Sequence, residues 1–264
     1  MLEVVNVKKV FNPKTPNEKI ALQRVNVTIN DGDFVTVIGG NGAGKSTLLN
    51  VVSGSAMPDG GRITLSTVDI TRKAQYKRAS YIGRVYQDPM MGTASEMTIE
   101  ENMAMALRRG EKRTLRKGRR NEERVLYREM LARLDLGLET RLKEKVGLLS
   151  GGQRQALALL MATIKKPDLL LLDEHTAALD PKTALTVMRI TDEIIRENAL
   201  TTLMVTHNMK DALTYGNRLI MMHEGSVLLD IGEQEKRKMG IKDLLALFEQ
   251  KSGEALNSDK MLLA

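Results

Sequence analysis

Cysteine and tryptophan are absent from this chain, and aromatic residues make up only 3% of it. Because there is no cysteine, disulfides, thiol catalysis and thiolate metal sites are excluded. The apolar stretches near 156–164 and 169–172 are too short to span a bilayer, and residues 1–10 lack the apolar core of a signal peptide. We therefore expect a cytoplasmic protein, in which any role at a membrane depends on a partner.

Positive charge is in excess, with a formal net charge of +7, and much of it lies in residues 108–128. We interpret this stretch as a solvated, charged face of a helix, because glutamates are interspersed with its basic residues. A surface that lies near anionic lipid headgroups is an alternative. Nucleic-acid binding is a weaker alternative, because the stretch lacks an evident aromatic platform for stacking on bases, and we expect no nucleic-acid partner.

The hydrophobic residues make up 42% of the chain, enough for a sizeable core, and their spacing follows two patterns. Strands are predicted at 4–7, 25–29, 34–38, 62–65, 80–85, 169–172, 202–206, 218–222 and 226–231. Helices are predicted at 44–52, 152–164, 181–198 and 242–250. Apolar residues at three-to-four spacing from Thr98 to Leu142 predict a helical insertion in an α/β core, and the tail after Ser252 is expected to be frayed.

A glycine-rich segment follows the predicted strand at 34–38 and opens the predicted helix at 44–52. It fits the phosphate-loop pattern G-x-x-x-x-G-K-[ST], whose glycines let backbone N–H groups converge on phosphate oxygens at a helix N-terminus. Lys45 would contact the β- and γ-phosphates, and the Ser46 hydroxyl would bind Mg²⁺. The strand–loop–helix context disfavours a purely structural turn. The candidate nucleotide-binding residues here are Gly39, Gly40, Asn41, Gly42, Ala43, Gly44, Lys45, Ser46 and Thr47.

Two acids, Asp173 and Glu174, directly follow the apolar run Leu169–Leu172. A buried strand of a parallel sheet presents such residues at the edge where nucleotides bind. Asp173 would bind Mg²⁺, directly or through water, and Glu174 would polarise an attacking water. Apolar strands often end in acids, so the signal gains its weight from the phosphate loop upstream.

The segment Leu149–Gln153, of sequence LSGGQ, opens a predicted helix. Ser150 is a good N-cap, so an ordinary capped turn is one interpretation. The other is a second phosphate-binding helix end, formed by Ser150, Gly151, Gly152 and Gln153. One chain does not need two such ends for one triphosphate, so this end would serve a nucleotide held by a second copy.

The phosphate loop, the LSGGQ segment and the strand with its two acids occur in the order found in the nucleotide-binding domains of ABC ATPases. The chain resembles this family over about residues 2–235, and LSGGQ is the family's specific signature. The resemblance implies an α/β fold: a P-loop NTPase core of the RecA-like type, an antiparallel β-subdomain and an inserted helical subdomain at about 88–150. Residues 236–264 would form a C-terminal helix and tail.

Further positions match residues of the family one by one. Gln87 matches the Q-loop glutamine, which contacts Mg²⁺ and water and links to the membrane partner. His207 matches the switch histidine that contacts the γ-phosphate, and Asp180 lies in the stretch that matches the D-loop at the dimer interface. Phe11 is the candidate for the ring that stacks on adenine, although a core phenylalanine fits the pattern nearly as well. The implied catalytic set is Lys45, Gln87, Glu174 and His207, and the implied metal set is Ser46, Gln87 and Asp173.

The chain departs from the family's pattern at two positions. Ala178 stands where members often have serine, so one hydrogen bond between subunits would be missing. His175 stands where proline or alanine is common, and we favour a structural role for it. The complete catalytic set argues against an inactive site.

The resemblance implies an ATPase that uses ATP and Mg²⁺ and works as a homodimer, with each ATP between Lys45 of one copy and Ser150–Gln153 of the other. Its partners would be transmembrane permease subunits at the cytoplasmic face of the membrane, with a substrate-binding lipoprotein in the full system. The likeness is greatest to ATPase components of amino-acid-type importers, for which aromatic amino acids are a candidate cargo by analogy. A two-chain exporter and a non-transport ATPase that acts on ribosomes or nucleic acid are the alternatives.

The surface that would contact the permease is residues 87–105, which are rich in methionine. Methionine is an adaptable apolar contact, but it is equally suited to a core. The candidates are Met90, Met91, Met97, Met103 and Met105.

Overall fold

The computed structural model describes residues 1–111 and 121–253, so most of the tail after Ser252 and the centre of the basic stretch lie outside the described residues. The chain divides into two compact units: residues 1–78 together with 200–264, and residues 79–199. The helical subdomain expected at about 88–150 falls within the second unit, and its exact bounds stay a prediction. The division between the ATPase domain and the C-terminal helix and tail, expected after residue 235, also stays a prediction. In the described ranges no helix is both long and apolar enough to cross a membrane.

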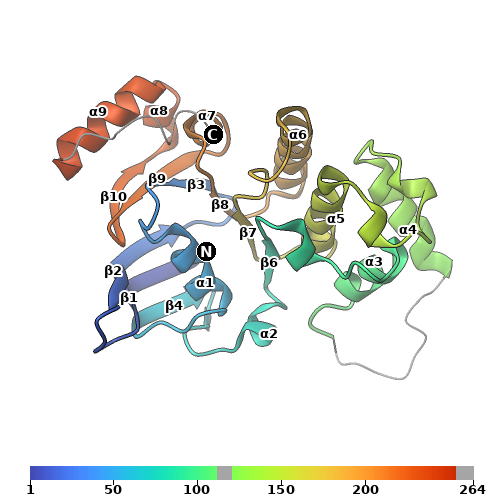
Figure 1. The fold of residues 1–264 in the computed structure, drawn as a ribbon, viewed down its shortest axis with the longest axis horizontal. Coiled ribbons are helices and arrows are strands. Elements are labelled where there is room, and N and C mark those ends of the chain that lie inside the picture. Colours follow the sequence, from blue (N-terminus) through green and yellow to red (C-terminus); the bar gives the residue numbers. More distant parts are fainter. Residues whose placement is uncertain (112–120, 254–264) are drawn as a thin grey trace. The chain divides into compact units, whose positions relative to one another are not determined.

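The first unit begins with an antiparallel sheet in the strand order β2-β1-β4-β5. β1 (Leu2–Phe11) pairs with β2 (Lys19–Ile29) on one side and with β4 (Gly60–Leu65) on the other, and β5 (Val68–Asp69) extends β4. Buried and exposed residues alternate at the end of β2, as the period-two pattern of the sequence predicts. Figure 1 shows these strands from blue to cyan.

A second group of strands in this unit is centred on β3 (Phe34–Ile38), in which every residue is buried. β3 lies parallel to β8 (Thr202–Val205) and to β9 (Arg218–His223), and β10 (Ser226–Ile231) returns antiparallel to β9. The glycine-rich loop leaves the carboxyl end of β3 and leads into α1 (Lys45–Ser53). This is the edge at which parallel sheets bind ligands.

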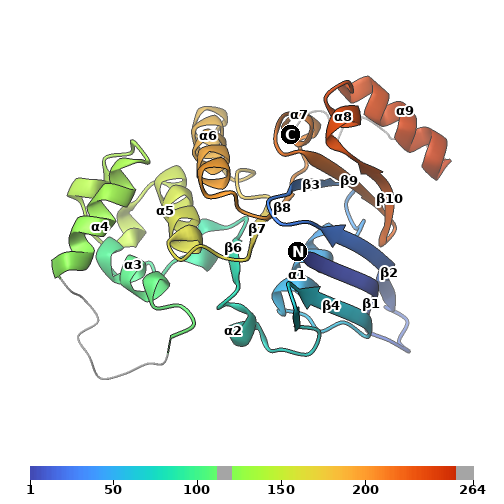
Figure 2. The same cartoon turned by 180° about the vertical axis from the view of Figure 1, so that it is seen from behind.

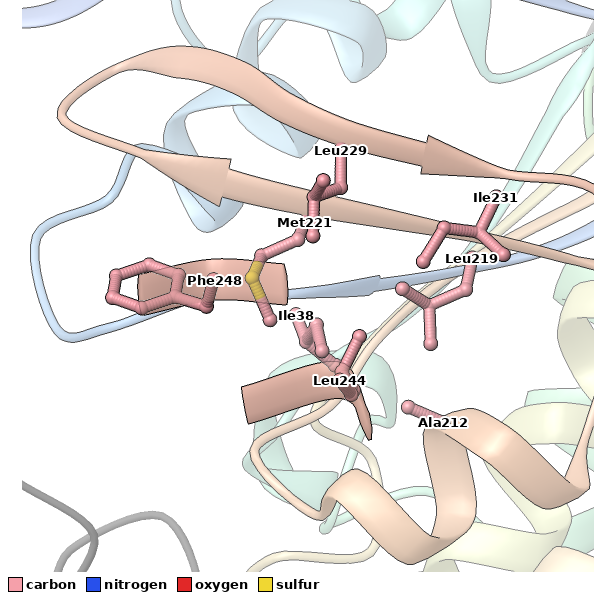
Figure 3. Close-up of a cluster of buried hydrophobic side chains, with 8 residues drawn as sticks. All are labelled: Ile38, Ala212, Leu219, Met221, Leu229, Ile231, Leu244 and Phe248. Atoms are coloured by element: carbon pink, nitrogen blue, oxygen red, sulfur yellow. The ribbon is translucent and has the colours of Figure 1, made fainter. Parts of the chain in front are cut away.

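The C-terminal helices α7 (Met209–Thr214), α8 (Glu233–Lys236) and α9 (Ile241–Ser252) belong to the same unit. α9 packs through its apolar face on β9, β10 and the end of β3, as Figure 3 shows. The buried side chains of this cluster are Ile38, Ala212, Leu219, Met221, Leu229, Ile231, Leu244 and Phe248. The strand that precedes the glycine-rich loop is therefore held from one side by the C-terminal helix.

The second unit contains the parallel pair β6 (Ile82–Val85) and β7 (Leu169–Asp173). Its longer helices are α3 (Ile99–Leu107), α4 (Asn121–Ala132), α5 (Gly151–Thr163) and α6 (Pro181–Asn198). Figures 1 and 2 show α3, α4 and α5 in one group from its two sides, and α6 contacts α5. The LSGGQ segment therefore begins α5, a helix that contacts α3 and α4 as well as α6.

The stretch Thr98–Leu142, predicted as a helical insertion, contains α3 and α4 among its described residues, but α-helix does not extend to its end. α4 ends at Ala132, and the chain then passes through Asp135 (φ 54°) and Gly137 (φ 70°), whose left-handed conformation stops a helix. The remaining short elements are α2 (Gln75–Arg78), η1 (Pro89–Gly92), η2 (Leu138–Thr140) and η3 (Val146–Leu148). Single turns of this kind are too short for periodicity to predict.

Candidate functional site

The glycine-rich loop ends at an open helix N-terminus. Gly44 stands at the N-cap of α1 with φ 100°, and no side chain caps the helix. The first turn of α1 carries no acidic residue. The first N–H groups of an α-helix have no partner within the helix, so this end is suited to binding an anion.

Two glycines of the loop are required by close backbone contacts. A Cβ on Gly39, which has φ 149°, would lie 2.2 Å from the carbonyl oxygen of Met222 in β9. A Cβ on Gly44 would lie 2.6 Å from the carbonyl oxygen of Ala21 in β2. The loop is therefore pressed against backbone on its inner side, and its shape cannot be kept with larger residues.

The hairpin turn between β9 and β10 supports the same loop. The Gly225 N–H donates to the Ala43 carbonyl at 3.0 Å, and the Gly225 carbonyl accepts from the Gln23 N–H at 2.7 Å. The turn thus joins the loop to β2. Sequence reasoning missed this contact, since the only local signal is a glycine in a hairpin turn.

The lysine of the loop points back over the loop itself. The Lys45 ammonium is buried and donates to the carbonyl oxygens of Gly39 at 2.8 Å and Gly40 at 3.2 Å. Ser46 is exposed at the beginning of α1, and Thr47 is half-buried. A cation, a hydroxyl and a helix end are thus grouped within one short segment, as phosphate binding requires.

His207 lies beside this loop through the pairing of two strands. β3 and β8 are parallel neighbours, and the Thr206 N–H donates to the Val37 carbonyl at 3.1 Å. On its other side, the Asn208 side chain caps α7 by accepting from the Asp211 N–H at 3.1 Å. His207 is therefore held between a strand end and a helix cap at the same sheet edge as the loop.

Phe11 lies at the end of β1 and is 40% exposed, which argues against a core role. Its partner across the sheet is Lys19, whose ammonium lies 3.5 Å from where a Cβ of Gly42 would stand. The Lys9 ammonium lies 5.5 Å from the centroid of the Phe11 ring. The ring thus lies near the Lys9 ammonium, and its strand neighbour Lys19 reaches the loop.

The second unit carries the two acids at the end of β7. Asp173 accepts a 2.8 Å hydrogen bond from the Arg84 guanidinium of β6, and both side chains are mostly buried. Glu174 follows with φ 47°, a left-handed conformation that costs about 1 kcal/mol or more in a non-glycine residue. Strained conformations of this kind are concentrated at functional sites.

His175 is buried and has a structural contact, which agrees with the role favoured from the sequence. Its Nε2 lies 3.1 Å from the Thr191 hydroxyl, which donates to the Val187 carbonyl of α6 at 2.7 Å. Because that hydroxyl proton is already used, the His175 Nε2–H is the donor in the first bond. Burial lowers the pKa of His175 from 6.5 to about 4, so the ring is neutral at physiological pH.

Gln87 is exposed and lies two residues after the end of β6. The preceding residue is held from two sides: the Gln155 amide donates to the Tyr86 carbonyl at 3.0 Å, and the Arg84 guanidinium lies 4.6 Å from the Tyr86 ring centroid. Gln155 is buried in α5. Sequence reasoning missed both Arg84 and Gln155, since neither belongs to a motif that the resemblance supplied.

The LSGGQ segment forms a capped helix end. The Ser150 hydroxyl accepts from the Gln153 N–H at 3.3 Å, and the Gln153 side chain accepts from the Ser150 N–H at 3.2 Å. A Cβ on Gly152 would lie 2.0 Å from Thr183 of α6. Asp180 caps α6 by accepting from the Thr183 N–H at 3.1 Å. Hydrogen bonds from the Thr183 side chain and main chain lower the pKa of Asp180.

The structure thus groups the predicted residues in two sets, one in each unit. The first unit brings together Phe11, the loop from Gly39 to Thr47, and His207. The second unit brings together Gln87, Ser150–Gln153, Asp173, Glu174 and Asp180.

The model of the ABC transporter family matches residues 22–177 of the chain. The chain belongs to the ABC transporter family. As an ABC transporter ATPase subunit it binds and hydrolyses ATP. The predicted fold, an α/β P-loop NTPase of the ABC type, is confirmed by solved ATP-binding cassettes.

Individual proteins of the ABC transporter family resemble the chain over most of its length. A tyrosine transport ATP-binding protein of Clostridioides difficile is 46% identical over 249 residues, which cover 94% of this chain and 99% of that protein. An energy-coupling factor transporter ATP-binding protein of Clostridium tetani is 33% identical over 234 residues, covering 87% and 78%. A dimeric ATP-binding cassette solved in a post-hydrolysis state with ADP and phosphate has a TM-score of 0.73 and 29% identity, covering 88% and 99%.

Proposed function

We propose that this ABC transporter ATPase energises the import of an aromatic amino acid, tyrosine or a close analogue, through a separate permease. The observation that carries the proposal is the 46% identity to a tyrosine transport ATP-binding protein, which extends over nearly the full length of both chains. Transport function depends on surfaces outside the ATP site, so similarity along the whole chain is a better guide to cargo than the motifs are.

In this proposal each of the two sets of residues contributes to binding and hydrolysing ATP. The loop Gly39–Thr47 holds the phosphates, with the Lys45 ammonium on the β- and γ-phosphates, and Phe11 stacks on adenine. His207 contacts the γ-phosphate. The exposed ring of Phe11 beside the loop and the uncapped N-terminus of α1 support these roles.

Magnesium is the metal that the proposed donors fit. Ser46, Gln87 and Asp173 offer hydroxyl, amide and carboxylate oxygens, which are the hard ligands that Mg²⁺ takes together with substrate phosphates and water. Among the described residues no group of three or more His, Cys, Asp or Glu side chains could hold a metal. The metal would neutralise phosphate charge when bound.

Hydrolysis depends on Glu174 in this proposal. Its carboxylate accepts a proton from the attacking water, a contribution of about 10²- to 10⁴-fold in rate. The adjoining residue His175 is buried and bonded to Thr191, so the main chain that carries Glu174 is fixed to α6.

A second copy of the chain is the first partner that we propose. Ser150–Gln153 of one copy would contact the nucleotide held by the loop of the other, in a two-fold dimer. The dimeric form of the solved cassette with ADP and phosphate supports this arrangement. Loss of the shared γ-phosphate on hydrolysis would open the dimer.

The permease is the second partner, and it would place the chain at the cytoplasmic face of the membrane together with a substrate-binding lipoprotein. Of the methionines expected to contact it, Met90, Met91 and Met105 are about half or more exposed, whereas Met103 is fully buried. The first three are therefore available to a partner, and Met103 is a core residue.

Uptake of labelled tyrosine tests the cargo. Cells whose only copy of the chain carries Glu174→Gln should lose energised tyrosine uptake, and excess phenylalanine should compete in cells with the wild-type chain. Leucine and spermidine uptake serve as controls and should not change. Tyrosine uptake at the wild-type rate would refute the proposed cargo, and ATP hydrolysis by the purified variant at the wild-type rate would refute the role of Glu174.

A further inference from the structure

The carboxylate proposed to bind the metal already carries a cation. Arg84 pairs with Leu171 across β6 and β7, and Asp173 lies two residues further along β7 on the same face. The guanidinium reaches this diagonal neighbour and donates to its carboxylate at 2.8 Å. The Arg84 side chain is 10% exposed and that of Asp173 is 13% exposed, so water screens the pair only weakly.

Arg84 is also fixed on its other side. Its guanidinium lies 4.6 Å from the ring centroid of Tyr86, the first residue after the end of β6. The Tyr86 main chain is in turn held by the buried amide of Gln155 at 3.0 Å. The guanidinium is therefore held by two contacts, with the Asp173 carboxylate and with the Tyr86 ring.

A divalent cation at Asp173 would share the carboxylate with this guanidinium. Two cations on one carboxylate repel each other, and the repulsion is strong where little water intervenes. A guanidinium attracts phosphate groups. Arg84 should therefore weaken the binding of a metal ion and strengthen that of a metal-free nucleotide.

We propose that Arg84 is a positioning residue that acts through Asp173: its fixed positive charge lowers the affinity of the site for Mg²⁺, so that the metal enters with the nucleotide and not before it. This inference rests on the proposed role of Asp173 in metal binding. Arg84 itself touches neither nucleotide nor metal in this account.

The test measures how much Mg²⁺ improves the binding of ADP, which is not hydrolysed. Calorimetric titration of the complete chain gives the Kd for ADP with excess Mg²⁺ and with EDTA, and the ratio of the two constants is the metal contribution. Arg84→Met should raise this ratio about five-fold or more, because a competing charge is removed. Arg84→Lys keeps the charge and should stay within about two-fold of the wild type. If Arg84 only held Asp173 in place, its removal would instead lower the metal contribution to ADP binding.

Two control variants separate the possible causes. Arg189→Met removes an exposed arginine of the same unit, paired with Glu193 at 2.8 Å, and should leave the ratio unchanged. If Arg84→Met does not fold, Arg84→Gln serves as the neutral variant. A ratio that is unchanged or lower in the folded neutral variant overturns this inference alone. Asp173→Asn should bring the ratio close to one; a wild-type ratio in that variant overturns the metal role of Asp173 itself.

Discussion

Two helices of this protein begin at segments expected to meet phosphate, yet their N-termini are built differently. α1 begins at a glycine loop with no side-chain cap, and backbone of β2 and β9 shapes that loop from its inner side. α5 begins with a complete capping box between Ser150 and Gln153. One helix end is thus left for a ligand, whereas the other is satisfied by its own side chains.

The difference shows how each end can serve a nucleotide. At α1 the N–H groups themselves are available to phosphate oxygens. At α5 the Ser150 hydroxyl oxygen already accepts from the Gln153 N–H, but its proton remains for an outside acceptor. The capping box therefore orients the Ser150 hydroxyl and leaves its O–H able to donate to a ligand.

The other ends of the same two helices are alike. Arg78 is fully buried and donates to the carbonyls of Val51 and Val52 in the last turn of α1, at 2.7 and 2.8 Å. Arg109 donates to the carbonyl of Ala162 in the last turn of α5 and to that of Lys165 just beyond the helix, at 3.1 Å each. A guanidinium at a helix C-terminus satisfies free carbonyls and favours the helix dipole.

Glycine-to-alanine substitution should give the largest effects, and unequal ones, at Gly39 in the loop before α1 and at Gly152 in the first turn of α5. Gly39→Ala meets the Met222 carbonyl and a left-handed φ together, so we expect a loss of about 4 kcal/mol or more in the free energy of unfolding, with loss of ATP binding. Gly152→Ala meets only the Thr183 methyl, which can rotate away, so we expect about 1–2 kcal/mol. Urea unfolding measures both. Equal losses would mean that the loop at α1 is not held more rigidly than the turn at α5.

Removing the arginines behind the helices should give the next largest effects. Arg78 also donates to the carbonyls of Lys73 and Thr71, at 2.8 and 3.1 Å, so Arg78→Met leaves more buried acceptors without a donor than Arg109→Met does. We expect losses of about 3–4 kcal/mol and about 2 kcal/mol in the free energy of unfolding. Arg62→Met, at an exposed arginine, is the control and should change little. An Arg78→Met variant as stable as the control would show that these hydrogen bonds do not support α1.

Acid should destabilise the chain through His175, which is buried in the second unit. Its pKa is about 4 in the folded chain and 6.5 when exposed, so the unfolded chain binds a proton over this range and the folded chain does not. The free energy of unfolding is therefore unaffected by this group above pH 6.5. It decreases as the pH falls from 6.5 to 4, by about 3 kcal/mol in total. His175→Gln should lower stability at pH 7 and flatten the dependence between pH 6.5 and 4. A variant with the wild-type slope would assign the acid sensitivity to other groups.

Much of the fold could be predicted from the sequence, because the strands and longer helices have clear hydrophobic periods. Phe34–Ile38 and Leu169–Leu172 are buried runs, and the capping role of Ser150 follows from its residue type. The break after Ala132 was missed, because left-handed residues interrupt a helix without interrupting its apolar spacing.

The candidate site was predictable where residues act close to their place in the chain. Contacts between distant segments were not, such as Arg84 with Asp173 or Gly225 with Ala43. They depend on strand register and on hairpin position, which local patterns do not contain. For this reason the glycine-rich loop before α1 could be recognised in the sequence. Its contacts with the backbone of β2 and β9 could not.

The smallest expected effect belongs to the cap that distinguishes α5 from α1. Ser150→Ala removes the acceptor for the Gln153 N–H and should lower the free energy of unfolding by about 1 kcal/mol. Ser150→Asn keeps a side-chain acceptor and should be within a few tenths of a kcal/mol of the wild type, but it lacks the hydroxyl. If the hydroxyl proton is the group that reaches the nucleotide, both variants should slow ATP hydrolysis, and only the first should also lose stability in urea. An Asn variant with full ATPase activity would mean that α5 contributes its cap and backbone alone, and the two helix ends would then serve phosphate in the same way.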